Sequence, residues 1–178
     1  MTILRAHPVA YFLTFRCYGT WLQGDHRGWV SRQDGNIPGT PLLPPAARLA
    51  RDGALRQRHP SFWFSEEARK VVAGTIREVA VFRGWPLEAL RVCASHVHVV
   101  LRASVEPERI LTQLKAWSTR RLMEAGKVQK GQRPWSEHGS TKYLWTEEAV
   151  RRAKFYVEHQ QDDPRVFADP RSRKYRGD

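Results

Sequence analysis

The spacing of apolar residues along the chain predicts four strands and three helices. Apolar residues that alternate with polar ones are typical of strands, and apolar residues three or four positions apart are typical of helices. Ser65 and Thr146 are suitable helix N-caps, and Gly84 and Pro86 end the first long helix. The predicted elements are strands at 10–17, 88–94, 96–102 and 142–145, and helices at 65–83, 106–125 and 147–160.

This order of elements predicts an α+β fold of the ferredoxin-like (RRM-like) kind. In such a fold an antiparallel sheet carries its helices on one face, and here an added C-terminal helix would close over the other face. Only one residue separates the second and third strands, so either their turn lies nearer 84–88 or the two runs form one long strand.

The domain organisation follows from where Gly, Pro and charge concentrate. We predict a single domain over 1–164 and a loose basic tail over 165–178. Residues 18–60 form an irregular insertion rich in Gly and Pro, with a short helix near 45–57. Long loops inside compact domains are often functional, so this insertion is either a lid or nucleic-acid contact, or a packed surface excursion.

Two histidines lie on one face of the predicted third strand. Side chains alternate along a strand, so Val97, Val99 and Leu101 face one way while His96 and His98 face the other. The two histidines are about 6.6 Å apart at their Cα atoms, close enough to share one metal ion. The alternative is a pair of half-exposed strand histidines without a ligand.

Composition points to a polyanionic partner. The chain has 30 Lys and Arg against 18 Asp and Glu, a formal charge of +12, which favours phosphate binding through counterion release. Seven Trp, seven Phe and five Tyr residues could stack on unpaired bases. No apolar run is long enough to cross a bilayer, so a membrane partner is not expected. A solvated basic surface over core aromatics is the other interpretation.

Basic residues on the predicted elements are the first candidates for DNA contact. Arg16 shares the mixed face of the first strand with Phe12 and Thr14, where it could reach a phosphate or lie solvated at an edge. We assign DNA binding to Arg16, Lys115, Arg120 and Arg152, and ordinary solvated cations are the alternative. Cys17 and Cys93 are the only cysteines and belong to no Cys-x-x-Cys pair, so we expect reduced thiols and a cytoplasmic location.

The last predicted helix carries a candidate nucleophile. Arg152, Tyr156 and Gln160 recur every four residues and form one stripe. A phenol has a reference pKa near 10 and needs help to attack, and a divalent ion that polarises a phosphodiester supplies that help. Gln160 offers an amide oxygen as third metal ligand, with His138 and His159 as rivals. Imidazole and oxygen ligands suit Mn²⁺, although Mg²⁺ is also compatible.

These motifs resemble the single-tyrosine HUH transposases, most closely the REP-associated branch. His96-Val97-His98 matches the His-apolar-His motif, and Tyr156 with Gln160 looks like its Tyr-x-x-x-Gln helix. The resemblance covers roughly residues 8–164 and implies a bacterial, nucleoid-associated protein that cuts and rejoins single-stranded or hairpin DNA. It implies a 5′-phosphotyrosine on Tyr156, with His96, His98 and Gln160 holding Mg²⁺ or Mn²⁺.

The sequence leaves some functional alternatives open. One is a non-catalytic RRM-like module that stacks single-stranded nucleic acid on its sheet. Another is a host-recruited nicking enzyme that no longer transposes. A homodimer is also compatible with the resemblance, because relatives place the tyrosine helix over their own histidines or over those of a partner.

Overall fold

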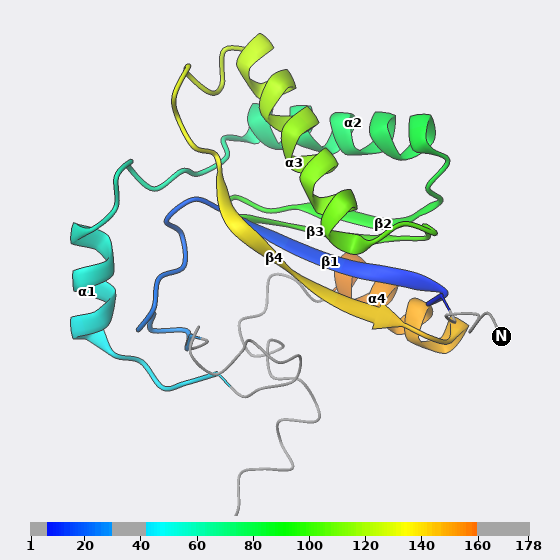
Figure 1. The fold of residues 1–178 in the computed structure, drawn as a ribbon, viewed down its shortest axis with the longest axis horizontal. Coiled ribbons are helices and arrows are strands. Elements are labelled where there is room, and N and C mark those ends of the chain that lie inside the picture. Colours follow the sequence, from blue (N-terminus) through cyan, green and yellow to red (C-terminus); the bar gives the residue numbers. More distant parts are fainter. Residues whose placement is uncertain (1–6, 30–41, 160–178) are drawn as a thin grey trace, which may run out of the picture.

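The computed structural model describes residues 7–29 and 42–159, which form one four-stranded antiparallel sheet with helices on both faces (Figure 1). The strand order is β2-β3-β1-β4, which is the ferredoxin-like arrangement, so the predicted fold class is confirmed. The elements are β1 (Ala10–Cys17), α1 (Ala47–Leu55), α2 (Glu66–Arg83), β2 (Leu87–Val92), β3 (His96–Leu101), α3 (Pro107–Glu124), β4 (Trp135–Leu144) and α4 (Glu147–His159).

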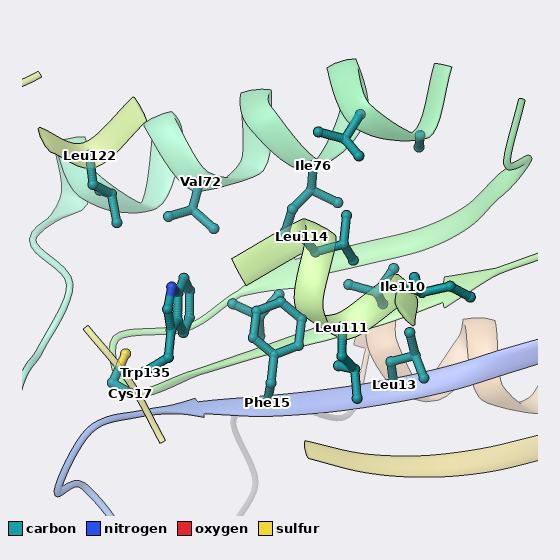
Figure 2. Close-up of a cluster of buried hydrophobic side chains, with 14 of the residues drawn as sticks. Leu13, Phe15, Cys17, Val72, Ile76, Ile110, Leu111, Leu114, Leu122 and Trp135 are labelled. Carbon is teal, nitrogen blue, oxygen red and sulfur yellow. The ribbon is translucent and has the colours of Figure 1, made fainter. Parts of the chain in front are cut away.

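The main core lies between one face of the sheet and the helices α2 and α3. Figure 2 shows Leu13, Phe15 and Cys17 of β1 pointing toward these helices. Val97, Val99 and Leu101 of β3 are buried in the same cluster, as the alternation along the strand predicts. This face therefore fixes which side of β1 and β3 remains for chemistry.

Helix α4 packs on the opposite face of the sheet (Figure 1). Its buried residues Val150, Ala153 and Val157 follow helical spacing and contact Phe12 and Val100 in a second apolar cluster. Because Tyr156 precedes Val157, its side chain lies at the border of this cluster and is partly buried. The prediction that a C-terminal helix covers the histidine face is confirmed.

The helix ends predicted from sequence are also confirmed. Ser65 Oγ accepts a hydrogen bond from the Ala68 amide at the start of α2, and Thr146 Oγ1 does the same for Ala149 in α4. Gly84 ends α2 with a φ of 65°, a left-handed conformation that suits glycine. No helix in residues 7–29 or 42–159 is long and apolar enough to cross a bilayer.

The turn between β2 and β3 lies at residues 93–95. The prediction that this turn lies nearer 84–88, or that the two strands are one long strand, is therefore wrong. The two strands form an antiparallel hairpin, and the Cys93 amide donates to the His96 carbonyl across the turn. The Cys17 amide and the Thr20 hydroxyl both donate to the Ser95 carbonyl, so β1 and the following segment hold the turn in place. The histidine strand therefore begins at a tightly held turn.

Neither cysteine is in a disulfide, as expected.

Strand β4 is longer than predicted. It starts at Trp135 and not at residue 142. An edge strand with one exposed face needs little apolar character, so its first part carries no clear strand pattern. Gly139 of β4 allows close packing on β1, since a Cβ there would lie 2.9 Å from the Thr14 carbonyl. The short helix predicted near 45–57 is α1, whereas residues 30–41 of the insertion and the tail at 165–178 lie outside the described residues.

Candidate active site

His96 and His98 face each other on the α4 side of the sheet. Their ring centroids are 4.7 Å apart and the rings are nearly perpendicular. His98 is buried and His96 is partly buried, so the pair is shielded rather than fully solvated. The structure thus brings together the two side chains that the strand periodicity placed on one face.

Two hydroxyl groups orient the imidazole rings. Thr14 Oγ1 lies 2.7 Å from His98 Nδ1, and Ser95 Oγ lies 3.0 Å from His96 Nδ1. When Nδ1–H donates to such a hydroxyl, Nε2 keeps the lone pair that a metal ion requires. Sequence reasoning missed the role of Thr14, although its position on the histidine face of β1 was the available signal.

His98 is held in the neutral form. Burial is the main cause, and the electrostatic influence of the neighbouring His96 and Arg16 side chains adds to it, lowering the pKa of His98 to about 2. His98 Nε2 is buried and has no hydrogen-bond partner among the described residues. A buried acceptor without a partner is costly unless a ligand satisfies it, so this atom is suited to a bound cation.

Tyr156 reaches the histidine pair from α4 of the same chain. Its ring lies edge-on to His98 with centroids 6.0 Å apart, and Phe12 contacts both rings. Burial raises the Tyr156 pKa, while the positive charge of Arg16 opposes the shift. The phenol is therefore protonated at neutral pH and must lose its proton as it attacks.

Arg16 is the basic residue at the centre of the site. It lies directly opposite His96 in the antiparallel pairing of β1 with β3. Its guanidinium carbon lies 3.6 Å above the ring of Trp21. Burial lowers the Arg16 pKa to about 10, so the side chain stays charged at neutral pH. The sequence predicted Arg16 but not Trp21, which holds the guanidinium by stacking.

The first part of the insertion folds against this site. Arg27 stacks on the same Trp21 ring at 4.3 Å, and its guanidinium donates to Asp25 and to the Thr20 carbonyl. The Trp21 indole donates to the Gly28 carbonyl, which closes the loop on itself. Residues 19–29 therefore form a folded loop that packs beside Arg16.

The donor set fits a divalent cation when substrate oxygen or water completes it. His96 and His98 supply two imidazole rings, and the orphaned Nε2 of His98 marks where the ion would bind. Within the described residues, no three His, Cys, Asp or Glu side chains cluster as a metal site. His138 and His159 therefore do not complete the set, and Gln160 lies outside the described residues.

The other predicted DNA-binding residues are not gathered at the histidines. Arg152 is exposed on α4 and pairs with Glu148 at 3.6 Å. Lys115 and Arg120 belong to α3, on the opposite side of the sheet, where Arg120 pairs with Glu124. Contact of these three residues with DNA stays a prediction.

Lys115 has a structural role that the sequence did not reveal. The register of β1 and β4 shifts between Phe15 and Cys17, which leaves residues 136–138 opposite Arg16 alone. The Lys115 ammonium donates to the carbonyls of Ser136, Glu137 and His138 at 2.9, 3.0 and 3.2 Å. Lys115 thus provides hydrogen-bond donors for the backbone carbonyls of this β-bulge, which lie outside the regular β1–β4 pairing.

Lys115→Met should therefore lower stability by about 1–3 kcal/mol, because three carbonyls lose a charged donor. Chemical denaturation measures this change. Lys154→Met on α4 is the control and should stay within about 0.5 kcal/mol of the wild type. Unchanged stability of Lys115→Met, together with weaker DNA binding, would instead favour a phosphate contact.

Comparison with protein-family models and with curated proteins returns no match. Solved structures that are similar in fold include the following two. One is described as a candidate transposase from Deinococcus radiodurans, with 18% identity, a TM-score of 0.43 and coverage of 87% of this chain and 92% of that one. The other is a REP-associated tyrosine transposase bound to a REP hairpin, with 11% identity, a TM-score of 0.44 and coverage of 88% and 70%. Both descriptions name transposases, the class that the sequence motifs resemble. Because both TM-scores are below 0.5, we base the function on the side chains of the site.

Proposed function

We propose that this protein is a metal-dependent endonuclease and strand transferase of the transposase kind, acting on single-stranded or hairpin DNA. The carrying observation is that Tyr156 lies against His98 in the same chain, beside the His96–His98 pair and Arg16. A phenol, two imidazoles and a guanidinium on one sheet face suit attack on a phosphodiester. A bound divalent cation would polarise the phosphodiester and offset its negative charge.

In the proposed reaction the Tyr156 oxygen attacks phosphorus and the bond from phosphorus to the 3′ oxygen breaks. The phenol proton passes to solvent, and the leaving oxygen takes up a proton to become a 3′-OH. Arg16, stacked on Trp21, binds a phosphate oxygen, and Phe12 holds the Tyr156 ring in place. The phosphotyrosine keeps the bond energy, so a 3′-OH can reseal the strand without ATP.

The non-catalytic RRM-like module is less well supported. Such modules stack bases on an open sheet face. Here α2 and α3 cover one face and α4 covers the other through Val150, Ala153 and Val157. The site also places a phenol hydroxyl group beside the histidine pair, which a binding module does not need.

The proposal is tested by mixing the protein with labelled single-stranded oligonucleotides and Mn²⁺ and separating the products on a denaturing gel. A covalent protein–DNA band that disappears with EDTA supports it. Non-covalent binding alone would favour the binding module.

Thr14→Val should weaken metal dependence without removing a ligand. The substitution keeps the shape of the side chain but deletes the hydroxyl beside His98 Nδ1. Loss of such an orienting partner typically costs about 10–100-fold in metal affinity or activity. Cleavage rate against Mn²⁺ concentration measures the effect. Thr112→Val removes a hydroxyl that donates to the Glu108 carbonyl on α3, away from the histidines, and its curve should match the wild type.

A further inference from the structure

A basic groove runs along the open edge of the sheet, between α2 and β2. It has a volume of about 750 Å³, and four of its lining residues are basic while two are acidic. Arg69, Lys70 and Arg77 come from α2, and Arg91 comes from β2. Lys70 is paired with Glu66 at 2.9 Å, whereas Arg69 and Arg77 have no carboxylate partner among the described residues.

The floor of the groove is unusually open. Ala73 and Gly74 of α2 line it, and a Cβ placed on Gly74 would meet nothing within 4 Å. Glycine inside a helix costs roughly 1 kcal/mol relative to alanine, and no packing contact in the described structure requires it here. The missing side chain instead leaves room for a ligand to approach the helix.

An orphaned polar atom marks the same place. Arg69 Nε is buried and has no hydrogen-bond partner among the described residues. Arg69, Ala73 and Arg77 recur every four residues, so the two arginines lie on one stripe of α2, about 12 Å apart at their Cα atoms. One strand carries one charge per roughly 3.4 Å in a duplex and somewhat more widely when extended, so a separation of about 12 Å suits two non-adjacent phosphates of one strand.

The groove lies next to the candidate active site, with Arg91 and Glu158 on its border. Arg91, which lines the groove, pairs with His98 across β2 and β3. Its guanidinium also reaches the Glu158 carbonyl at 3.4 Å, and Glu158 lies two residues after Tyr156 on α4. A strand leaving the tyrosine can therefore pass around the β2 edge into the groove.

We propose that this groove binds the sugar–phosphate backbone of a few nucleotides flanking the phosphodiester that Tyr156 attacks. The inference rests on the proposed function for the identity of the strand. A volume near 750 Å³ is that of a site for a drug-sized molecule, which is enough for a short stretch of one strand. Binding here is to phosphate and is independent of base sequence.

The test uses the full chain with Tyr156→Phe, so that binding is measured without cleavage. Fluorescence anisotropy with short and long oligothymidylates gives affinity as a function of salt. Arg69→Ala with Arg77→Ala should lower the salt slope on the long oligonucleotide by about 1.4, or 0.7 for each lost contact. The control pair, Arg83→Ala with Arg109→Ala, removes the same charge from exposed positions elsewhere and should leave the slope unchanged.

Gly74→Leu tests the groove without changing its charge. Leucine favours the helix and fills the floor, so affinity for the long oligonucleotide should fall at least tenfold while affinity for the short one is kept. Equal slopes for the two arginine pairs, or wild-type affinity of Gly74→Leu for the long oligonucleotide, would overturn the proposal.

Adduct formation by the protein with Tyr156 intact separates the two proposals. If the parent protein forms a covalent adduct but the groove variants bind DNA normally, the groove proposal is rejected and the endonuclease proposal stands. If the double arginine variant shows a smaller salt slope but the parent protein forms no adduct, the groove stands as a binding site and the endonuclease proposal is rejected.

Discussion

Tyr156→Phe should abolish the covalent adduct and lower DNA cleavage by roughly 10⁴- to 10⁶-fold, the range seen when a nucleophile is removed. The change deletes one hydroxyl and keeps the ring, which contacts His98 and Phe12. DNA affinity and thermal stability should therefore remain close to the wild type. Cleavage in single-turnover conditions with Mn²⁺ measures the loss.

Tyr143→Phe is the matched control. Tyr143 lies on β4 opposite Tyr11, whose side chain faces the α2–α3 core, and it stacks on Trp145. It therefore points away from the histidine face, and its variant should cut normally. Cleavage by Tyr156→Phe at the wild-type rate would exclude Tyr156 as nucleophile and make Tyr143 or Tyr175 the candidates.

His98→Ala should eliminate metal-dependent cleavage while the protein still folds. Loss of a ligand should cost more than the about 10–100-fold expected for an orienting partner. The fold should persist because the core side of β3 is made by Val97, Val99 and Leu101. Cleavage rate and metal affinity, each followed against Mn²⁺ concentration, measure the effect, and His96→Ala should behave alike.

The exposed histidine of α4 provides the control for this prediction. His159 stacks on Phe155 and lies 3.2 Å from the Phe155 carbonyl through Nδ1. His159→Ala should therefore show a normal Mn²⁺ curve. Unfolding of both His96→Ala and His98→Ala, with no metal effect on the wild type, would show that the pair is structural.

Local periodicity was sufficient to predict most of the fold. The alternation in β1 and β3 placed the core residues on one face and His96 and His98 on the other, because strand geometry leaves no other arrangement. Helical spacing and caps located α2, α3 and α4. Strand β4 was mostly missed, since edge strands with an exposed face carry polar residues.

The parts of the site that sequence could not supply depend on contacts between distant segments. Thr14 reaches His98 only because β1 and β3 pair in register, and Trp21 reaches Arg16 only because residues 19–29 fold back. Lys115 was assigned to DNA contact or to solvent, and not to a structural role, because nothing local predicts a bulge in β4. The groove at the β2 edge likewise depends on how α2 crosses the sheet.

The most direct test of the central claim is the fate of DNA end labels in the covalent adduct. The protein is incubated with Mn²⁺ and a pool of single-stranded and hairpin oligonucleotides labelled at either the 3′ or the 5′ end, then analysed on a denaturing gel. A 5′-phosphotyrosine retains the downstream fragment, so the 3′ label should move with the protein and the 5′ label should leave on a fragment ending in 3′-OH. Peptide mapping of the adduct should identify Tyr156. Transfer of the 5′ label, attachment to another residue, or no protein-bound label at all would contradict the account.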